Sequence, residues 1–185
     1  MSATPGVGVL VSGSGSNLQA LIDSGIPVAA VAADVAGAGG LVRAEAAGVP
    51  TAVFPLAAHA DRDARDLAMA VWLEANGVGL VVCAGYMQLL RPVFLDRFPG
   101  KVVNVHPALL PAFPGAHAVE DALAAGAVET GATVHLVDEG VDTGTVLRQE
   151  AVAVLPGDTR ETLHARIQAV EHRLLPAVVK GLIAA

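Results

Sequence analysis

Asn104 and His106 are two polar residues in a run that is otherwise apolar and β-branched. They are two positions apart, so on an extended strand both side chains project to the same side. An amide N–H can stabilise a developing oxyanion, and an imidazole can carry a proton near neutral pH. The pair therefore indicates a polar site with acid–base capacity, although two hydrogen-bonded core side chains would give the same pattern.

The element that positions this pair is a strand, predicted from the valines between Val102 and Val105. The strand is followed by a loop in which Pro107, Pro111 and Pro114 restrict the backbone. Ligands of open α/β sheets bind beyond the carboxyl ends of the strands. The position therefore favours a functional site over core packing, but it does not by itself name a reaction.

A second candidate site is the turn at residues 12–17, with the sequence Ser-Gly-Ser-Gly-Ser-Asn. A predicted strand, Val7–Val11, precedes it, and a helical pattern with Leu18 and Leu21 follows. Glycines allow close approach of a ligand to the backbone, and free N–H groups at a helix start attract anions. The spacing fits neither a dinucleotide fingerprint nor a P-loop, so it indicates a single phosphate monoester. The alternative is a simple N-cap by Ser16.

Two acidic residues complete the candidate set. Asp142 lies in an acidic segment bounded by glycines, where a solvated turn is the common explanation. The functional alternative is a carboxylate that the fold brings to His106, where it would orient the imidazole. Glu171, in the last predicted helix, is either a surface charge or a contact to a ligand amine.

Strands and helices are predicted to alternate along the chain, which indicates an α/β fold with a doubly wound, mostly parallel sheet and helices on both faces. A length of 185 residues predicts one domain, residues 1–185. A short turn before the last strand predicts an antiparallel strand near the C-terminal edge. The predicted strands are 7–11, 27–33, 51–54, 80–84, 102–105, 133–137 and 146–154; the helices after the first are 41–47, 61–75, 92–97, 119–125 and one opened by Asp158.

The composition excludes several classes of protein. The formal net charge is −7 and no basic run occurs, which argues against non-specific nucleic-acid binding. The single cysteine, Cys83, excludes an internal disulfide framework and a multi-cysteine zinc site, and we predict no metal. No apolar run reaches membrane-spanning length and no signal peptide is evident, so we expect a cytoplasmic protein without a membrane partner.

Three motifs together resemble the folate-dependent formyltransferases: the turn at 12–17, Asn-x-His-Pro-x-Leu-Leu-Pro at 104–111, and Asp-x-Gly at 142–144. The motif order is kept over nearly the whole chain. Further matches are Pro114-Gly-x-His117, Gly131-x-Thr-Val-His135 and Glu171-His172. The resemblance implies a Rossmann-like fold, and transfer of the formyl group of 10-formyltetrahydrofolate to the amine of glycinamide ribonucleotide in purine synthesis.

The resemblance also implies roles for particular residues. Asn104 and His106 would stabilise the oxyanion of a tetrahedral intermediate, and Asp142 would hold His106 in its required orientation and protonation state. A cis peptide is implied before Pro111. The implied ribonucleotide contacts, in the phosphate-binding N-terminal half and the last helix, are Gly15, Ser16, Asn17 and Glu171. The implied folate contacts are Arg62, Met87, Gln88, Leu89, Leu90 and Asn104, with the catalytic residues mainly in the C-terminal half.

Two other classes stay open. A deformylase or a methionyl-tRNA formyltransferase-like enzyme would share the formyl-folate chemistry, but we expect such enzymes to carry a regulatory or tRNA-binding domain that this sequence does not show. A non-catalytic phosphate-binding module would leave the Asn-His-Asp set unexplained. The expected partners are small-molecule substrates, with the protein a monomer or homodimer.

Overall fold

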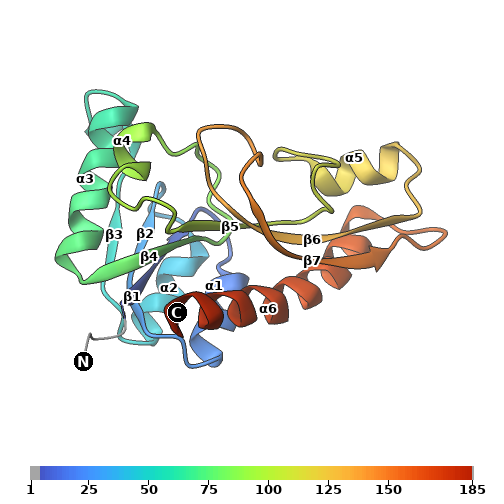
Figure 1. The fold of residues 1–185 in the computed structure, drawn as a ribbon, viewed down its shortest axis with the longest axis horizontal. Coiled ribbons are helices and arrows are strands. Elements are labelled where there is room, and N and C mark those ends of the chain that lie inside the picture. Colours follow the sequence, from blue (N-terminus) through green and yellow to red (C-terminus); the bar gives the residue numbers. More distant parts are fainter. Residues whose placement is uncertain (1–4, 185) are drawn as a thin grey trace.

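The fold is organised on one seven-stranded sheet, whose strand order is β3-β2-β1-β4-β5-β6-β7 (Figure 1). The structure is a computed structural model, and it describes residues 5–184. The strands are β1 (Gly6–Val11), β2 (Val28–Ala33), β3 (Thr51–Val53), β4 (Val78–Cys83), β5 (Val102–His106), β6 (Glu129–Leu136) and β7 (Val146–Ala153). The helices are α1 (Ser16–Asp23), α2 (Gly39–Ala46), α3 (Arg62–Ala75), α4 (Pro92–Leu95), α5 (Ala118–Ala124) and α6 (Arg160–Ala184), with a short 3-10 helix η1 (Leu56–Ala58).

The pairing of the strands confirms the doubly wound, mostly parallel sheet. Strands β3, β2, β1, β4 and β5 are parallel, each next to its neighbour in that order. Strand β6 runs antiparallel to β5, and β7 runs antiparallel to β6. The predicted antiparallel strand near the C-terminal edge is thus confirmed. Strand β6 is also antiparallel to β5, because the connection from β5 to β6 does not return the chain to the opposite end of the sheet.

Helices cover both faces of the sheet, and the alternation of side chains along β1 illustrates why. Val7, Val9 and Val11 are fully buried in the core that contains α1, α2 and α6. Leu10 points to the opposite core, which contains α3 and α4. This period of two divides the apolar residues between two layers. In Figure 1, the long helix α6 runs beside β6 and β7 and reaches back to α1, so one helix connects the antiparallel edge of the sheet with the first helix.

The last helix differs from its prediction in its capping residue. Thr159, not Asp158, takes the capping position, because its hydroxyl accepts a hydrogen bond from the backbone N–H of Thr162 at 3.3 Å. The hydroxyl of Thr162 in turn accepts from the backbone N–H of Thr159 at 2.9 Å, which is a reciprocal cap. Pro176 lies inside the continuous helix without ending it.

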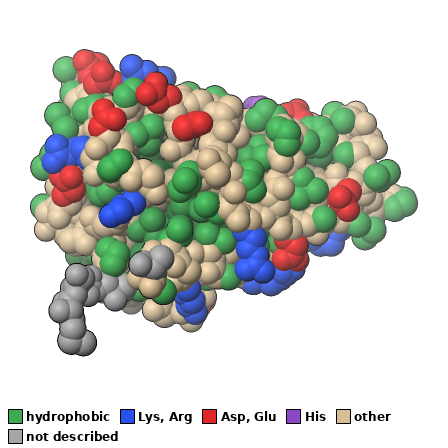
Figure 2. All heavy atoms as spheres, viewed as in Figure 1, with side chains coloured by type: hydrophobic (Ala, Val, Ile, Leu, Met, Phe, Trp, Pro, Cys, Tyr) green, Lys and Arg blue, Asp and Glu red, His purple; other side chains and the backbone are tan. Residues whose placement is uncertain are grey.

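The surface carries charges of both signs. Figure 2 shows Lys and Arg side chains beside Asp and Glu side chains over the face that it draws. Ion pairs of this kind include Arg97 with Glu74 and Arg173 with Glu150. Within residues 5–184, the helices lack the combination of length and apolar character that a membrane crossing requires.

Candidate active site

The turn between β1 and α1 is shaped by its backbone. Gly15 has a left-handed φ of 74° and occupies the N-cap position of α1 without a side-chain hydrogen bond. The predicted N-cap by Ser16 is therefore wrong, because Ser16 is already the first helical residue. A Cβ atom at Gly15 would lie 2.4 Å from the Cα of Gly40, so the close approach of α2 requires a glycine here.

Helix α2 also holds the turn by hydrogen bonds. The backbone N–H of Gly40 donates to the carbonyl of Gly13 at 3.1 Å. The Nε of Arg43 donates to the carbonyl of Ser14 at 2.8 Å. Because two carbonyls of the turn accept hydrogen bonds from α2, the conformation of the turn is fixed before any ligand binds.

A cavity of about 400 Å³ opens between this turn and α6. Its walls include residues 12–17 on one side and four polar residues of α6 on the other. Those four are Arg160, His164, Gln168 and Glu171. All four ribonucleotide contacts that the resemblance implied therefore line one cavity: Gly15, Ser16, Asn17 and Glu171.

Asn17 and Glu171 join the two walls of this cavity. The Nδ2 of Asn17 donates to Oε2 of Glu171 at 3.0 Å, and both residues are buried. Burial raises the pKa of Glu171, while the hydrogen bond from Asn17 opposes that rise. The Oδ1 atom of Asn17 is buried without a partner in the described chain. Glu171 is thus not the surface charge that the sequence left as one of two explanations.

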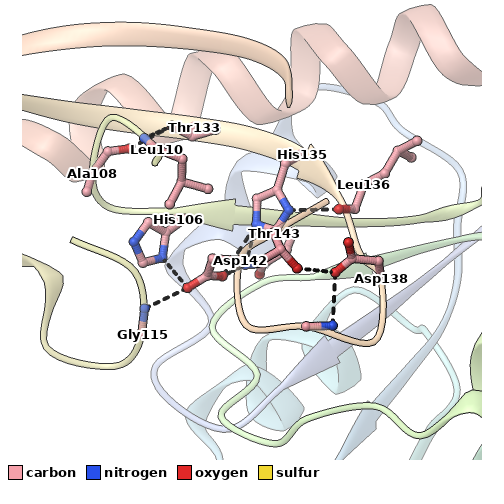
Figure 3. A network of polar contacts seen from close by, with 12 residues as sticks. His106, Ala108, Leu110, Gly115, Thr133, His135, Leu136, Asp138, Asp142 and Thr143 are labelled. Atoms are coloured by element: carbon pink, nitrogen blue, oxygen red, sulfur yellow. Dashed lines mark hydrogen bonds and ion pairs between the residues drawn. The ribbon is translucent and has the colours of Figure 1, made fainter. Parts of the chain in front are cut away.

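The second polar cluster forms around the carboxylate of Asp142 (Figure 3). The Nδ1 of His106 lies 3.3 Å from Oδ2 of Asp142. The Nδ2 of Asn104 lies 3.5 Å from Oδ1 of the same carboxylate. Since both strand residues approach one carboxylate, they project to the same side of β5, and Asp142 is brought to His106 from a segment 36 residues further along the chain.

His135 is a member of this cluster to which the sequence assigned no role. It lies on β6 directly opposite Asn104 in the strand register. Its Nε2 is 3.2 Å from Nδ2 of Asn104 and 3.5 Å from Oδ1 of Asp142, and its Nδ1 donates to the carbonyl of Leu136. The alternation of polar and apolar residues in β6 was a signal for this position, but the register with β5 was needed to place it.

The surroundings of Asp142 keep its carboxylate charged. Burial alone would raise the pKa of Asp142, but other contacts outweigh it. They are the hydrogen bond with His135, the N–H of Gly115 at 2.7 Å from Oδ2, and the charges of His106 and His135. The pKa of Asp142 therefore lies below its ordinary value of 3.8, which suits a group that orients imidazole rings.

The loop after β5 closes over the other side of His106. The Nε2 of His106 donates to the carbonyl of Phe113 at 2.7 Å. The hydroxyl of Thr133 accepts from the N–H of Leu110 and donates to the carbonyl of Ala108, which ties the loop to β6. The peptide bond between Leu110 and Pro111 is cis, as the resemblance implied.

Two further cavities adjoin the Asp142 cluster. One, of about 310 Å³, is lined by Met87, Gln88 and Leu89 together with Asn104, His106 and Asp142. A smaller one, of about 90 Å³, is lined by Gln88, Leu89 and Leu90 and by Cys83 and Tyr86. Of the implied folate contacts, Arg62 stands apart, because it is exposed at the first position of α3 and lines neither cavity.

The cavities form a connected series through shared walls. The cavity between the glycine turn and α6 and the 310 Å³ cavity share Gly85, Met87, Val105 and Pro107. The 310 Å³ and 90 Å³ cavities share Gln88, Leu89, Asn104 and Asp142. The 310 Å³ cavity, whose wall carries Asn104, His106 and Asp142, is therefore the middle one of the three. No group of side chains within residues 5–184 is arranged to hold a metal ion.

The fold and these cavities define an α/β protein of Rossmann-like architecture with a polar cluster in the wall of adjoining cavities. The chain belongs to the formyl transferase family, to which residues 7–179 match.

Relatives and solved structures agree with this family. A phosphoribosylglycinamide formyltransferase of Mycobacterium tuberculosis is 51% identical over 179 residues, covering 94% of this chain and 83% of that protein. The human trifunctional purine biosynthetic protein adenosine-3 is 43% identical over 180 residues, which are 94% of this chain and 18% of that protein. The crystal structure of glycinamide ribonucleotide transformylase 1 from Symbiobacterium toebii superposes with a TM-score of 0.95 at 48% identity, covering 98% of this chain and 88% of that one. The predicted resemblance and fold class are confirmed.

Proposed function

We propose that this chain transfers the formyl group of 10-formyltetrahydrofolate to the glycinamide amine of 5′-phosphoribosylglycinamide, the reaction of a phosphoribosylglycinamide formyltransferase. The observation that carries the proposal is that Asn104, His106 and Asp142 line the 310 Å³ cavity, which shares walls with the cavity beside the glycine turn. The relative that is named for this reaction is 51% identical over most of the chain, which supports the same substrate pair.

The ribonucleotide occupies the cavity beside the glycine turn in this proposal. The phosphate binds at Gly15–Asn17, where the N–H groups at the start of α1 have no intrahelical acceptor. Glu171 accepts hydrogen bonds from the sugar or the glycinamide part, since its carboxylate is already held by Asn17. The N-terminal half of the single domain thus supplies most of the phosphate site.

The formyl donor occupies the two cavities on the far side of Asn104. Their walls fit a flat ring system, because Leu89, Leu90 and Tyr86 offer apolar contact and Gln88 offers an amide. Burial raises the pKa of the Cys83 thiol to about 12, so the thiol stays neutral and is not a nucleophile. When bound, the donor supplies a carbonyl carbon at the oxidation level of a formyl group. Arg62 is exposed, so in this proposal it contacts a part of the donor that remains outside these cavities.

The residues of the cluster have distinct tasks in the proposed reaction. The glycinamide amine attacks the formyl carbon, and the resulting tetrahedral intermediate carries an oxyanion. The Nδ2 of Asn104 and a protonated His106 stabilise that oxyanion; removing one such donor typically lowers the rate about 10²–10³-fold. Asp142 accepts from Nδ1 of His106, so the opposite nitrogen, Nε2, is the one that exchanges its bond to the Phe113 carbonyl for the reacting atoms. His106 then gives its Nε2 proton to the leaving nitrogen of the folate while the bond from that nitrogen to the formyl carbon breaks and the oxyanion returns to a carbonyl. The neutral imidazole takes up the proton that the attacking amine loses.

The other features of the proposal follow from these ligands. Both substrates are small molecules, and the reaction needs no metal ion, nucleic acid or membrane partner. A monomer or a homodimer would satisfy it equally, since every residue named above comes from one chain.

The test is a coupled assay with the purified protein. Glycinamide ribonucleotide and a 10-formylfolate donor are mixed, and the deformylated folate is followed by absorbance with and without the ribonucleotide. Release that depends on the ribonucleotide supports the proposed transfer. Release without the ribonucleotide would favour a deformylase, and no release in either case would contradict the proposed activity.

A further inference from the structure

The cavity beside the glycine turn has an unusual second wall. Arg160, His164 and Gln168 follow one another at intervals of four residues, so they share one face of α6. Among the described residues that line this cavity, Arg160 and His164 are the two whose side chains can carry positive charge. The glycine turn opposite them contributes hydroxyl, amide and backbone groups only.

A phosphate monoester carries negative charge that the side chains of the turn do not neutralise. The ester carries about two negative charges near neutral pH. Glu171 adds a carboxylate to the same cavity. The chain as a whole carries a net charge of −7, so the general field of the protein does not attract an anion. A fixed positive group near the turn is therefore expected, and guanidinium groups bind phosphate in a fork geometry.

We propose that Arg160 is the charged phosphate-binding residue of this chain and that His164 is a hydrogen-bond donor beside it. The inference rests on the proposed function, because it requires a ribonucleotide in this cavity. Nothing in the motifs that carry the family resemblance points to either residue.

The contacts of Arg160 allow this role. Its Nε donates to Oε1 of Glu120 on α5 at 2.5 Å, and about half of the Arg160 side chain is exposed. Within residues 5–184 the guanidinium of Arg160 makes no other hydrogen bond, so its two terminal nitrogens are available to a ligand. Glu120 therefore orients Arg160 and, by its charge, also opposes an anion that approaches the same group.

His164 is half-buried one turn further along α6. Burial lowers the pKa of His164, and the charge of Arg160 lowers it further, while Glu120 opposes the shift. The imidazole is consequently neutral near pH 7, where it offers one N–H to a phosphate oxygen. Within the wall of this cavity the positive charge is thus assigned to Arg160, because Arg43, which donates to the carbonyl of Ser14, lines a different cavity.

Two substitutions in one ion pair separate this role from a structural one. Arg160→Gln should weaken the binding of glycinamide ribonucleotide about tenfold, the size expected for a lost charged hydrogen bond. Glu120→Gln keeps an acceptor for Nε but removes the opposing charge, so binding should tighten about twofold. Both substitutions break the same ion pair, so a purely structural role would shift the affinity in the same direction for both variants.

The measurement is isothermal titration of each variant with glycinamide ribonucleotide, without a formyl donor. Arg173→Gln is the matched control, because Arg173 lies on α6, pairs with Glu150 and does not line the cavity. His164→Ala should weaken binding, and His164→Gln, which keeps an N–H donor, should restore most of the loss. For the riboside that lacks the phosphate, kcat/KM should be equal in Arg160→Gln and in the unsubstituted protein.

The results distinguish this inference from the proposed function. If the unsubstituted protein neither binds the ribonucleotide nor transfers a formyl group to it, both proposals fail. If it does both and Arg160→Gln behaves like Arg173→Gln, only the role of Arg160 is overturned. An equal loss in kcat/KM for the ribonucleotide and the riboside would also overturn it, because the effect would not depend on the phosphate.

Discussion

The two polar sites of this protein are built in opposite ways. The turn between β1 and α1 is a local structure, made by six consecutive residues and held by hydrogen bonds that α2 donates to two of its backbone carbonyls. The Asp142 cluster is made by side chains from β5, β6 and the loop before β7. A local site depends on the backbone conformations of its own residues, whereas an assembled site depends on strand register and on charge.

The surroundings of the two sites match this difference. The turn follows a strand in the parallel part of the sheet, at the edge where parallel strands commonly place ligands. The Asp142 cluster lies where the sheet becomes antiparallel, so β6 can present His135 opposite Asn104. The first arrangement suits the positioning of a substrate, and the second suits proton transfer between groups with different electrostatic surroundings.

Asp142→Asn should have the largest effect, because it removes the charge on which the assembled site depends. We expect kcat to fall about 10²–10³-fold, within the range typical of general acid–base groups, with little change in the KM for the ribonucleotide. The measurement is steady-state kinetics with both substrates varied.

Asp138→Asn is the matched control for that loss. Asp138 belongs to the same loop and accepts from the N–H of Gly140 and the hydroxyl of Thr143, and asparagine preserves both acceptor contacts. We expect less than about a threefold change in kcat, as for an exposed polar substitution. An equal loss in both variants would mean that loop geometry, not the charge at position 142, governs the site.

The same contrast explains what the sequence could predict. The strand–turn–helix at 7–23 was predictable because periodicity and glycine spacing are local signals. The approach of Asp142 to His106 was an expectation drawn from residue types, since the contact spans 36 positions in the chain. His135 had no assigned role because only the register of β6 against β5 reveals its neighbours.

Capping residues were a second limit of the sequence. Ser16 and Asp158 are both residue types that cap helices well, yet Gly15 and Thr159 occupy the capping positions. At the first helix, the capping position lies so close to Gly40 that it leaves no room for a side chain. At the last helix, Asp158 instead accepts from the N–H of Leu155 and the hydroxyl of Thr162 and pairs with Arg166. Tertiary contacts chose between neighbours of similar intrinsic preference.

Gly15→Ala should have the next largest effect, because it tests whether the local site depends on backbone conformation. The left-handed φ of 74° costs about 1–2 kcal/mol for a residue with a Cβ atom. The predicted contact of 2.4 Å with the backbone of Gly40 adds about 1–3 kcal/mol as overpacking. We therefore expect a loss of about 2–5 kcal/mol in the free energy of unfolding, measured by urea denaturation.

Gly13→Ala is the comparison within the same turn. Gly13 has no left-handed φ, and a Cβ atom there would meet nothing within 4 Å. Its free energy of unfolding should change by less than about 0.5 kcal/mol, as at an unconstrained surface position. Equal destabilisation by both substitutions would show that general loss of glycine flexibility, rather than the conformation of Gly15, is responsible.

Glu171→Gln should have the smallest effect, and it concerns the hydrogen bond from Asn17 to Glu171 that joins the turn to α6. The pKa of Glu171 is raised above its ordinary value of 4.5, chiefly by burial. Between 4.5 and that raised pKa, the folded protein keeps a proton that the unfolded chain has lost, so the stability supplied by this group is lost as pH rises. Glutamine cannot titrate, and its amide oxygen can still accept from Asn17. The variant should therefore gain stability relative to the unsubstituted protein between pH 4.5 and pH 8.

Urea denaturation at pH 4.5 and pH 8 measures this change in the free energy of unfolding. Glu161→Gln on the same helix is the control, and its change in the free energy of unfolding should have the opposite sign. The pKa of Glu161 is lowered by hydrogen bonds from its own backbone N–H and from Thr159. Stability from Glu161 is thus present above pH 4.5 and is lost as pH falls through its lowered pKa, so its substitution should cost stability at pH 8. If both variants lost stability equally at pH 8, the carboxylate of Glu171 would be well solvated by the cavity. The local site would then not carry the strain of a buried charge, and only the Asp142 cluster would depend on electrostatics.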